Sequence, residues 1–431
     1  MKIANKLLGI CTPLAGFAVA AVSLLCAITH GEQPAVDAGL QAVPDVKWDA
    51  LFDRTSGWTG GDGVGTVDLG QGRVLWLFGD TWIGEVAGGA HVPGSQMVNN
   101  SLGLHGGDCR KTGDPPAQGE MRFHWGQNDA RGRPTAWIVP DPRRVQGNTK
   151  ASDPERPYGW YWPTGGAAVA PGPRGKPRLV VFLFHIGKAE DRTGIWAFKS
   201  LGGALAIVDN FDQPVPQWHV EQHEIPAAVS TDMAKAQSGL RETNWGMAAI
   251  WQPAATKNSA GDLYVYGVRD ESFLNRQLLL ARVPADAVEE SGKWRFYAGD
   301  GRWSSRLQDA ASTADGLVSE LSVEEYTVGG RRMLVMVHSE PFLGRRIFVR
   351  TASRPEGPWT RPVPVYSVPE VDRNRTYFTY AAKGHLQLSR PGELLTSYVV
   401  NSHDFGAMFK DASIYRPRFI SIPTHRLGVE R

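Results

Sequence analysis

The chain has 431 residues, of which 42% are hydrophobic and 10% aromatic, and this composition is enough to bury a large core. Its formal net charge is +2 without a long run of either sign, which argues against a nucleic-acid partner because phosphate binding needs clustered positive charge. The 15 tryptophans suit flat amphipathic ligands such as sugars, although most tryptophans of a large β protein belong to its core.

The N-terminus has the pattern of a targeting segment. Two lysines precede an apolar stretch over residues 7–27, and polar residues follow it. We predict that residues 1–31 form a secretory signal peptide, with an uncleaved anchor or a lipoprotein site at Cys26 as alternatives, and that the protein is secreted or periplasmic. Residues 32–44 are then a short linker. After removal of the signal only Cys109 remains of the three cysteines, so no internal disulfide is expected.

The following region has the pattern of β structure. Runs such as residues 73–78 and 179–184 are short, apolar and bounded by turn residues, and no convincing amphipathic helix exceeds three turns. We predict one catalytic domain over residues 45–424 and a short tail over residues 425–431.

One pattern occurs five times within this domain. A strand of small residues is followed by a turn and by an apolar strand that stops at polar or charged residues. The repeats begin near Asp62, Trp162, Trp245, Glu320 and Tyr380. Repeats of this kind predict sheets arranged around an axis, and we therefore predict an all-β fold, a single five-bladed β-propeller with four-stranded blades.

Each blade needs two further strands. The candidates for the third strand are residues 100–104, 194–198, 277–281, 346–350 and 418–422. The candidates for the outer strand are residues 121–125, 218–220, 294–297 and 363–366. The fifth repeat lacks its own outer strand. We predict that the stretch from Trp48 to Phe52 supplies it and closes the ring, which leaves no open sheet edge.

This topology predicts where a site lies. The first strand of each repeat starts at the face of the propeller where the second strand ends. The residues before the first strand and after the second therefore lie around the same opening of the propeller. Any single polar strand end has an ordinary explanation, because strands end where the chain meets water. We predict that the following residues bind substrate: Trp82, Trp162, His185, Asn244, Trp245, Asp270, His338, Tyr380, His385 and His403. We predict no metal, because the histidines fit no short ligand spacing, and no cofactor.

Three segments resemble a known family. Residues 61–81 are similar to the opening blade of a glycosidase-like five-bladed propeller family, formerly a domain of unknown function, that includes endo-D-arabinanases. Residues 353–359 are similar to a blade-end turn of the wider arabinanase, xylosidase and levansucrase propellers, and residues 380–385 and 395–398 to the final blade of the same group. The resemblance covers most of residues 55–422. It implies a glycoside hydrolase that cuts a furanose-rich polysaccharide internally, with D-arabinan as the best guess.

The resemblance also implies roles for three carboxyls. Glycoside hydrolysis commonly uses one carboxyl to protonate the leaving oxygen and another to activate water or to attack the sugar. By the pattern of the wider group, Asp62 is the base or nucleophile and Glu320 the acid, with Asp80 beside Asp62 as an alternative partner. The chain departs from this pattern at the third repeat, where Asn244 stands in place of an auxiliary aspartate. Which two of the three carboxyls form the catalytic pair stays open.

Other function classes are weighed against this one. A serine hydrolase is disfavoured, because the sequence has no Gly-x-Ser-x-Gly motif. A non-catalytic propeller that binds glycans or proteins at the cell surface is the main alternative, since the fold hosts both roles. Within enzymes, the alternatives are L-arabinan, fructan or a β-linked pentose polymer. We expect a monomer with a polysaccharide substrate, no nucleic-acid partner, and no membrane contact beyond the N-terminal segment.

Overall fold

The computed structural model describes residues 42–107, 109–144, 153–255, 259–272, 275–328 and 330–427. These residues belong to one compact unit, which is all-β, with 48% of the residues in strands and 14% in helices. The all-β part of the predicted fold is therefore confirmed. The predicted signal or anchor and most of the predicted linker lie outside the described residues. In the described ranges, no helix combines the length and the apolar character needed to cross a membrane.

Most strands belong to antiparallel sheets whose order follows the chain. The first sheet contains β3 (Gly65–Gly70), β4 (Arg73–Phe78), β8 (Ser101–His105) and β9 (Arg122–His124). The second contains β10 (Trp160–Pro171), β11 (Pro177–Lys188), β12 (Phe198–Val208) and β13 (Val220–Glu224). The third contains β14 (Thr243–Gln252), β15 (Asp262–Ser272), β16 (Asn275–Pro284), β17 (Arg295–Tyr297), β18 (Trp303–Ser304) and, paired with β16, β19 (Ala314–Leu317).

Two further sheets of this kind follow. The fourth contains β20 (Leu321–Val328), β21 (Arg331–Ser339), β22 (Arg346–Ala352) and β23 (Val363–Ser367). The fifth contains β24 (Tyr377–Gly384), β25 (Glu393–Ser402), β26 (Pro417–Pro423) and β1 (Val43–Pro44). A small additional sheet joins β2 (Ser56–Gly61), β5 (Thr81–Ala87), β6 (Ala90–His91) and β7 (Gln96–Val98).

The helices of the described residues are short. The α-helices are α1 (Val46–Leu51), α2 (Cys109–Thr112), α3 (Thr231–Ala236) and α4 (Phe405–Lys410). The 3-10 helices are Pro173–Gly175, Gly194–Trp196, Val215–Gln217, Ala285–Ala287, Ser291–Lys293, Leu307–Asp309, Pro341–Leu343, Pro369–Arg373, Leu386–Leu388 and Thr424–Arg426.

The first strands of the five larger sheets lie in a closed cycle. β3 contacts β10, β10 contacts β14, β14 contacts β20, and β20 contacts β24. The cycle closes through side chains, because His385, directly after β24, is hydrogen-bonded through Nδ1 to the Thr66 hydroxyl of β3 at 2.7 Å. The starts of all five sheets therefore surround a common centre.

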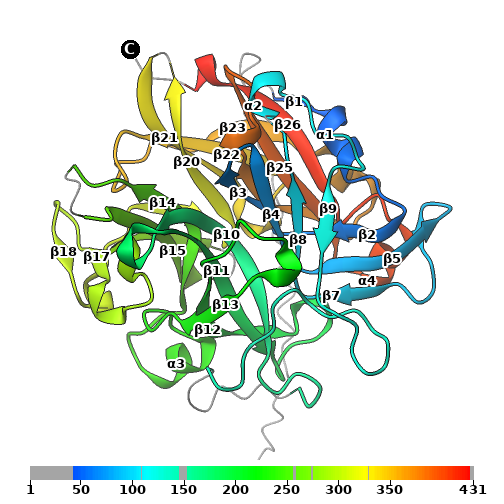
Figure 1. The fold of residues 1–431 in the computed structure, drawn as a ribbon, viewed down its shortest axis with the longest axis horizontal. Helices are drawn as coiled ribbons and strands as arrows, with labels where there is room; N and C mark the ends of the chain where they lie inside the picture. The colour runs from blue at the N-terminus through cyan, green and yellow to red at the C-terminus, as the bar shows by residue number, and fades with distance from the viewer. Residues whose placement is uncertain are drawn as a thin grey trace, which may run out of the picture. The chain divides into compact units, whose positions relative to one another are not determined.

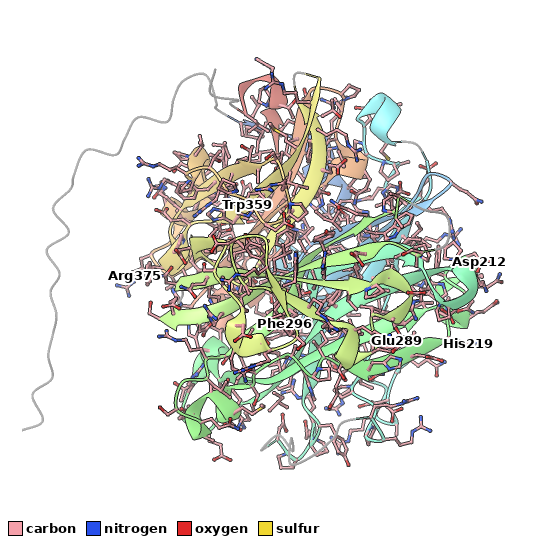
Figure 2. The ribbon with its side chains drawn as sticks, turned by 90° about the vertical axis from the view of Figure 1, so that its left-hand side faces the viewer. Asp212, His219, Glu289, Phe296, Trp359 and Arg375 are labelled. Carbon is pink, nitrogen blue, oxygen red and sulfur yellow. The ribbon has the colours of Figure 1, made fainter. Side chains whose placement is uncertain are left out.

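Buried clusters lie between neighbouring sheets. Leu77 of the first sheet shares a cluster with Val181 of the second, and Trp76 of the first shares another with Phe419 of the fifth. Figure 2 shows side chains filling the spaces between the ribbons, with Phe296 of β17 among them. Burial of these apolar faces, at roughly 25 cal/mol per Å² of apolar area, is the main force that holds the sheets together.

The closing strand was predicted at the wrong residues. The stretch from Trp48 to Phe52 is helical over α1, and Val43 and Pro44 pair with β26 instead, so the first and last described segments lie side by side (Figure 1). Asp45 caps the helix, since its side chain accepts from the Trp48 backbone amide at 3.4 Å. Trp48 and Leu51, one helical turn apart, are both buried. The apolar residues that suggested a strand are therefore buried on one side of a short helix.

A second correction concerns the second sheet. Of the predicted third strand over residues 194–198, Gly194–Trp196 form a 3-10 helix instead, and β12 begins only at Phe198. Gly194 has a φ of +65°, a conformation that favours glycine and does not continue a strand. The other third-strand candidates coincide with β8, β16, β22 and β26.

Candidate active site

Asp62 and Asp80 lie side by side because two chain segments pair beyond the ends of their strands. The Asp62 amide donates to the Asp80 carbonyl at 3.2 Å, and the Gly79 amide donates to the Asp62 carbonyl at 2.9 Å. A Cβ atom at Gly79 would come within 2.4 Å of Asp62 Oδ1, so the carboxyl occupies the space that glycine leaves free. The predicted neighbourhood of the two aspartates thus follows from local pairing.

Two tyrosines hold the Asp62 carboxyl. The hydroxyls of Tyr380 and Tyr415 both donate to Asp62 Oδ2, at 2.5 and 2.8 Å. Burial keeps the pKa of both phenols well above 10, so they remain neutral donors. Asn401 in turn donates to the Tyr380 hydroxyl at 3.2 Å. These contacts fix the orientation of one carboxyl oxygen.

Asp80 has a different environment. Its Oδ1 accepts from Trp162 Nε1 at 2.7 Å and from Asn99 Nδ2 at 3.0 Å. Burial raises the pKa of Asp80 to about 6, while these two hydrogen bonds and the positive charge of Arg156 lower it. The hydrogen bonds thereby favour the ionised form of this carboxyl.

Glu320 belongs to a buried ion pair. Lys383 Nζ lies 3.2 Å from Glu320 Oε1, and it also donates to the Gly63 carbonyl. The Lys383 side chain is only 2% exposed, and a lysine is rarely buried to this degree unless it is paired. The Glu320 carboxyl and the Gly63 carbonyl are thus the partners of this buried ammonium group.

The three carboxyls influence each other electrostatically. Burial is the main cause that raises the pKa of Asp62 to about 8, and the charges of Asp80 and Glu320 raise it further, against the hydrogen bonds from the tyrosines. Like charges close together disfavour simultaneous ionisation. At neutral pH the site therefore favours a protonated Asp62 beside an Asp80 with a lower pKa, which is the pairing that acid–base catalysis requires.

All three carboxyls line one cavity of about 690 Å³. Trp162, Asn244 and Tyr380 of the predicted set line it as well. Much of the remaining wall is aromatic, and its rings are Trp160, Phe184, Trp196, Phe198, Phe378, Phe405 and Tyr415. A cavity that combines aromatic rings with converging polar groups is typical of a small-molecule or sugar site.

The structure places several predicted residues elsewhere. The Trp82, His185, Trp245, His338 and His385 side chains are buried and do not line the cavity. Asp270 lies behind the wall and forms an ion pair with the cavity residue Arg276 at 2.7 Å. The exposed His403 packs its ring against Phe378, with centroids 4.6 Å apart.

The buried residues have structural contacts instead. The Trp82 ring stacks on His91, and the Trp245 indole donates to the Ala227 carbonyl at 3.0 Å. His185 Nε2 lies 2.7 Å from the Tyr158 carbonyl oxygen.

The other two histidines are held by side chains. His338 accepts from Arg350 Nε at 3.2 Å, and His385 lies between Thr66 and Ser397. Burial lowers the pKa of His338 and of His385 to about 3, so both are neutral.

The residues of the site that sequence reasoning missed include Asn99, Glu242, Lys383 and Tyr415. Glu242 lies two residues before Asn244 at the start of the third sheet, so a carboxyl is present close to where an auxiliary aspartate was expected. A lysine within the apolar strand β24 is a signal in the sequence that points to a buried charge.

Backbone strain also gathers at this site. Val64, Ala381 and Tyr415 have φ values of 25°, 57° and 59°, which are uncommon for residues other than glycine. Each is at, or within two residues of, Asp62 or one of its tyrosine partners. Strain of this kind costs about 1–3 kcal/mol per residue and clusters at functional sites. Within the described residues, no group of three or more His, Cys, Asp or Glu side chains could hold a metal ion.

The family described as a domain of unknown function (DUF5005) matches residues 45–425. No curated protein matches the sequence. The structure of a candidate hydrolase from Bacteroides ovatus is similar over 91% of this chain and 97% of its own, with a TM-score of 0.62 and 19% sequence identity, which is a likeness of fold.

Two glycosidase structures overlap with the chain more weakly. An exo-β-1,3-galactanase from Phanerochaete chrysosporium has 10% identity over 84% of this chain and 60% of its own, with a TM-score of 0.40. A sialidase from Trypanosoma rangeli has 10% identity over 84% of this chain and 44% of its own, with a TM-score of 0.37.

Proposed function

The chain belongs to the family described as a domain of unknown function (DUF5005), and from its carboxyl site we propose that it is a glycoside hydrolase with a five-bladed β-propeller fold. Each of the five larger sheets counts as one blade, and the site lies at the common centre. The observation that carries the proposal is the pair Asp62 and Asp80, two adjacent carboxyls whose environments separate their pKa values to about 8 and about 6.

Asp62 is the general acid in this proposal. Its protonated carboxyl gives a proton to the glycosidic oxygen as the bond from that oxygen to the anomeric carbon breaks. Asp80 is the general base or nucleophile: it either takes a proton from the attacking water or attacks the anomeric carbon itself. These roles reverse the one that the resemblance implied for Asp62.

Glu320 is not the acid in this proposal, because its carboxyl is engaged in an ion pair, with Oε1 lying 3.2 Å from Lys383 Nζ. Its negative charge instead contributes to the raised pKa of Asp62. Glu320 is thus a positioning residue that acts through its neighbour.

The proposed substrate is a furanose-rich polysaccharide cut internally, with D-arabinan as the best guess, and the proposed place of action is outside the cytoplasm. The aromatic wall of the cavity supports a sugar substrate, because aromatic rings pack well against the apolar faces of sugars. The choice of D-arabinan rests on the resemblance of residues 61–81 to the family that includes endo-D-arabinanases.

Product release from a panel of polysaccharides tests the proposal. D-arabinan, L-arabinan, xylan and levan are incubated with the wild type and with Asp62→Asn, and the oligosaccharides are separated by chromatography. Products from D-arabinan with the wild type alone support the endo-D-arabinanase assignment. Products from another polymer support the assignment as a glycoside hydrolase but assign it a different substrate. If folded wild type binds a glycan but releases nothing, and Asp62→Asn binds equally well, the protein is a binding propeller instead.

The pH dependence of kcat/KM follows from the two aspartates. Activity should rise as Asp80 loses its proton near pH 6 and fall as Asp62 loses its proton near pH 8, which gives a bell-shaped profile. Glu320→Gln should move the upper limb to lower pH, because it removes a charge that raises the pKa of Asp62. An upper limb that is the same in Glu320→Gln and in the wild type would contradict this assignment of the acid.

A further inference from the structure

A second polar cluster lines the same cavity at the start of the third sheet. It consists of Glu242, Asn244 and Arg276 on the cavity wall, with Ser200 of β12 beside them and Asp270 behind. None of these side chains contacts the carboxyls of Asp62, Asp80 or Glu320 through any hydrogen bond in the described part of the chain. The cluster is therefore a separate group of polar side chains within one cavity.

Hydrogen bonds hold the members of this cluster in place. Ser200 Oγ donates to Asn244 Oδ1 at 3.2 Å, and Asn244 Nδ2 lies 3.4 Å from Glu242 Oε1. The Thr231 hydroxyl donates to Glu242 Oε2 at 2.6 Å. Arg276 is held through its Nε atom, 2.7 Å from Asp270 Oδ1. Side chains fixed in this way are preorganised to receive a ligand.

Two polar atoms of the cluster can form more hydrogen bonds than they do in the structure. Arg276 Nη1 is buried and has no hydrogen-bond partner within the described residues. Glu242 Oε1 accepts only the long hydrogen bond from Asn244, although a carboxylate oxygen has two lone pairs. A buried donor without a partner is costly, so a ligand that supplies an acceptor there gains affinity. A cluster that has both a donor without a partner and an acceptor with spare capacity suits a hydroxyl group, which can accept and donate a hydrogen bond.

An aromatic pair connects this cluster to the carboxyl site. Trp162, whose indole donates to Asp80, packs edge-on against Phe198 with ring centroids 5.0 Å apart. Phe198 is two residues from Ser200 on the same strand, and side chains two apart on a strand lie on the same face. The two polar groups are thus joined by a ring surface of the kind on which a sugar rests.

We propose that Glu242, Asn244 and Arg276 form a second sugar subsite, which binds the hydroxyl groups of a sugar residue next to the one at the scissile bond. The inference rests on the proposed function and deepens it. The substrate is then a neutral oligosaccharide or polysaccharide, whose chain crosses the Trp162–Phe198 pair from one subsite to the other. A single glycoside with a small leaving group reaches the carboxyls without reaching this subsite.

Arg276→Gln and Glu242→Gln test the subsite. Both are made in the wild type for kinetics and together with Asp80→Asn for binding, and Arg345→Gln is the matched control. Arg345 also pairs with an aspartate, Asp372, at 2.7 Å, but it does not line the cavity. Thermal unfolding of each variant establishes that it folds. If one of the two subsite variants does not fold, the other still tests the subsite.

The expected result is a loss that depends on chain length. Loss of hydrogen bonds to a charged group should weaken binding of D-arabinan oligosaccharides by about 10- to 100-fold in calorimetry, and raise KM on the polymer similarly. Hydrolysis of an aryl D-arabinofuranoside, which does not reach the subsite, should be affected far less than that of the polymer. Equal effects on the short and long substrates, or none on either, would overturn the subsite. Wild type that hydrolyses neither substrate would reject the proposed function, and calorimetry would still decide for or against the subsite.

Discussion

Asp80→Asn is expected to lower kcat by about 10²- to 10⁴-fold, the usual contribution of a positioned acid or base, with a far smaller change in KM. Asparagine keeps the size of the side chain and an amide oxygen. That oxygen can accept from Trp162 Nε1 and Asn99 Nδ2 as the carboxylate does, so the fold should be retained. The amide can neither take a proton from water nor attack the sugar. Steady-state kinetics on the polymer that the wild type cleaves, with circular dichroism of both proteins, measures the effect.

Asp68→Asn is the matched control for this variant. Asp68 lies on β3, where it is exposed and accepts from the Gly70 amide at 2.7 Å, and it does not line the cavity. It should retain wild-type kcat. If Asp80→Asn keeps more than about a tenth of the wild-type kcat, Asp80 does not have the role proposed for it.

Lys383→Met should have the largest effect on stability, a loss of about 3 kcal/mol in the free energy of unfolding. Removing one partner of a buried ion pair costs about 3–5 kcal/mol, because the other charge stays buried. The lower end applies, since Glu320 faces the cavity and its side chain is 21% exposed. The Gly63 carbonyl also loses a donor. Urea unfolding monitored by tryptophan fluorescence measures the loss.

A double variant separates the charge from the packing. Lys383→Met with Glu320→Gln leaves no unpaired charge, so it should recover part of the stability lost in Lys383→Met. As a surface comparison, Lys199→Met should cost less than about 1 kcal/mol, because its partner Asp232 is 61% exposed. A double variant that is no more stable than Lys383→Met would show that the ion pair is not what stabilises the centre.

The sequence by itself determined the fold class and most of the strand pairs. Short apolar runs bounded by glycine, proline and aspartate predicted the hairpins, because these patterns depend on residues close together in the chain. Asp62 and Asp80 also lie close together in the chain, and the segments that carry them pair directly with each other. The closing strand was predicted in the wrong place because Trp48 and Leu51 fit a buried helical turn as well as a strand.

Only the tertiary structure decided which polar and aromatic residues face the cavity. Successive side chains of a strand point to opposite faces, so a single position separates a cavity residue from a core residue. Asn244 lines the cavity while Trp245 is buried in the core, and Trp162 lines it while Tyr161 is buried. Lys383 and Tyr415 meet residues that are more than 300 positions away. Such contacts depend on how five sheets pack around one centre, and no local pattern in the sequence encodes them.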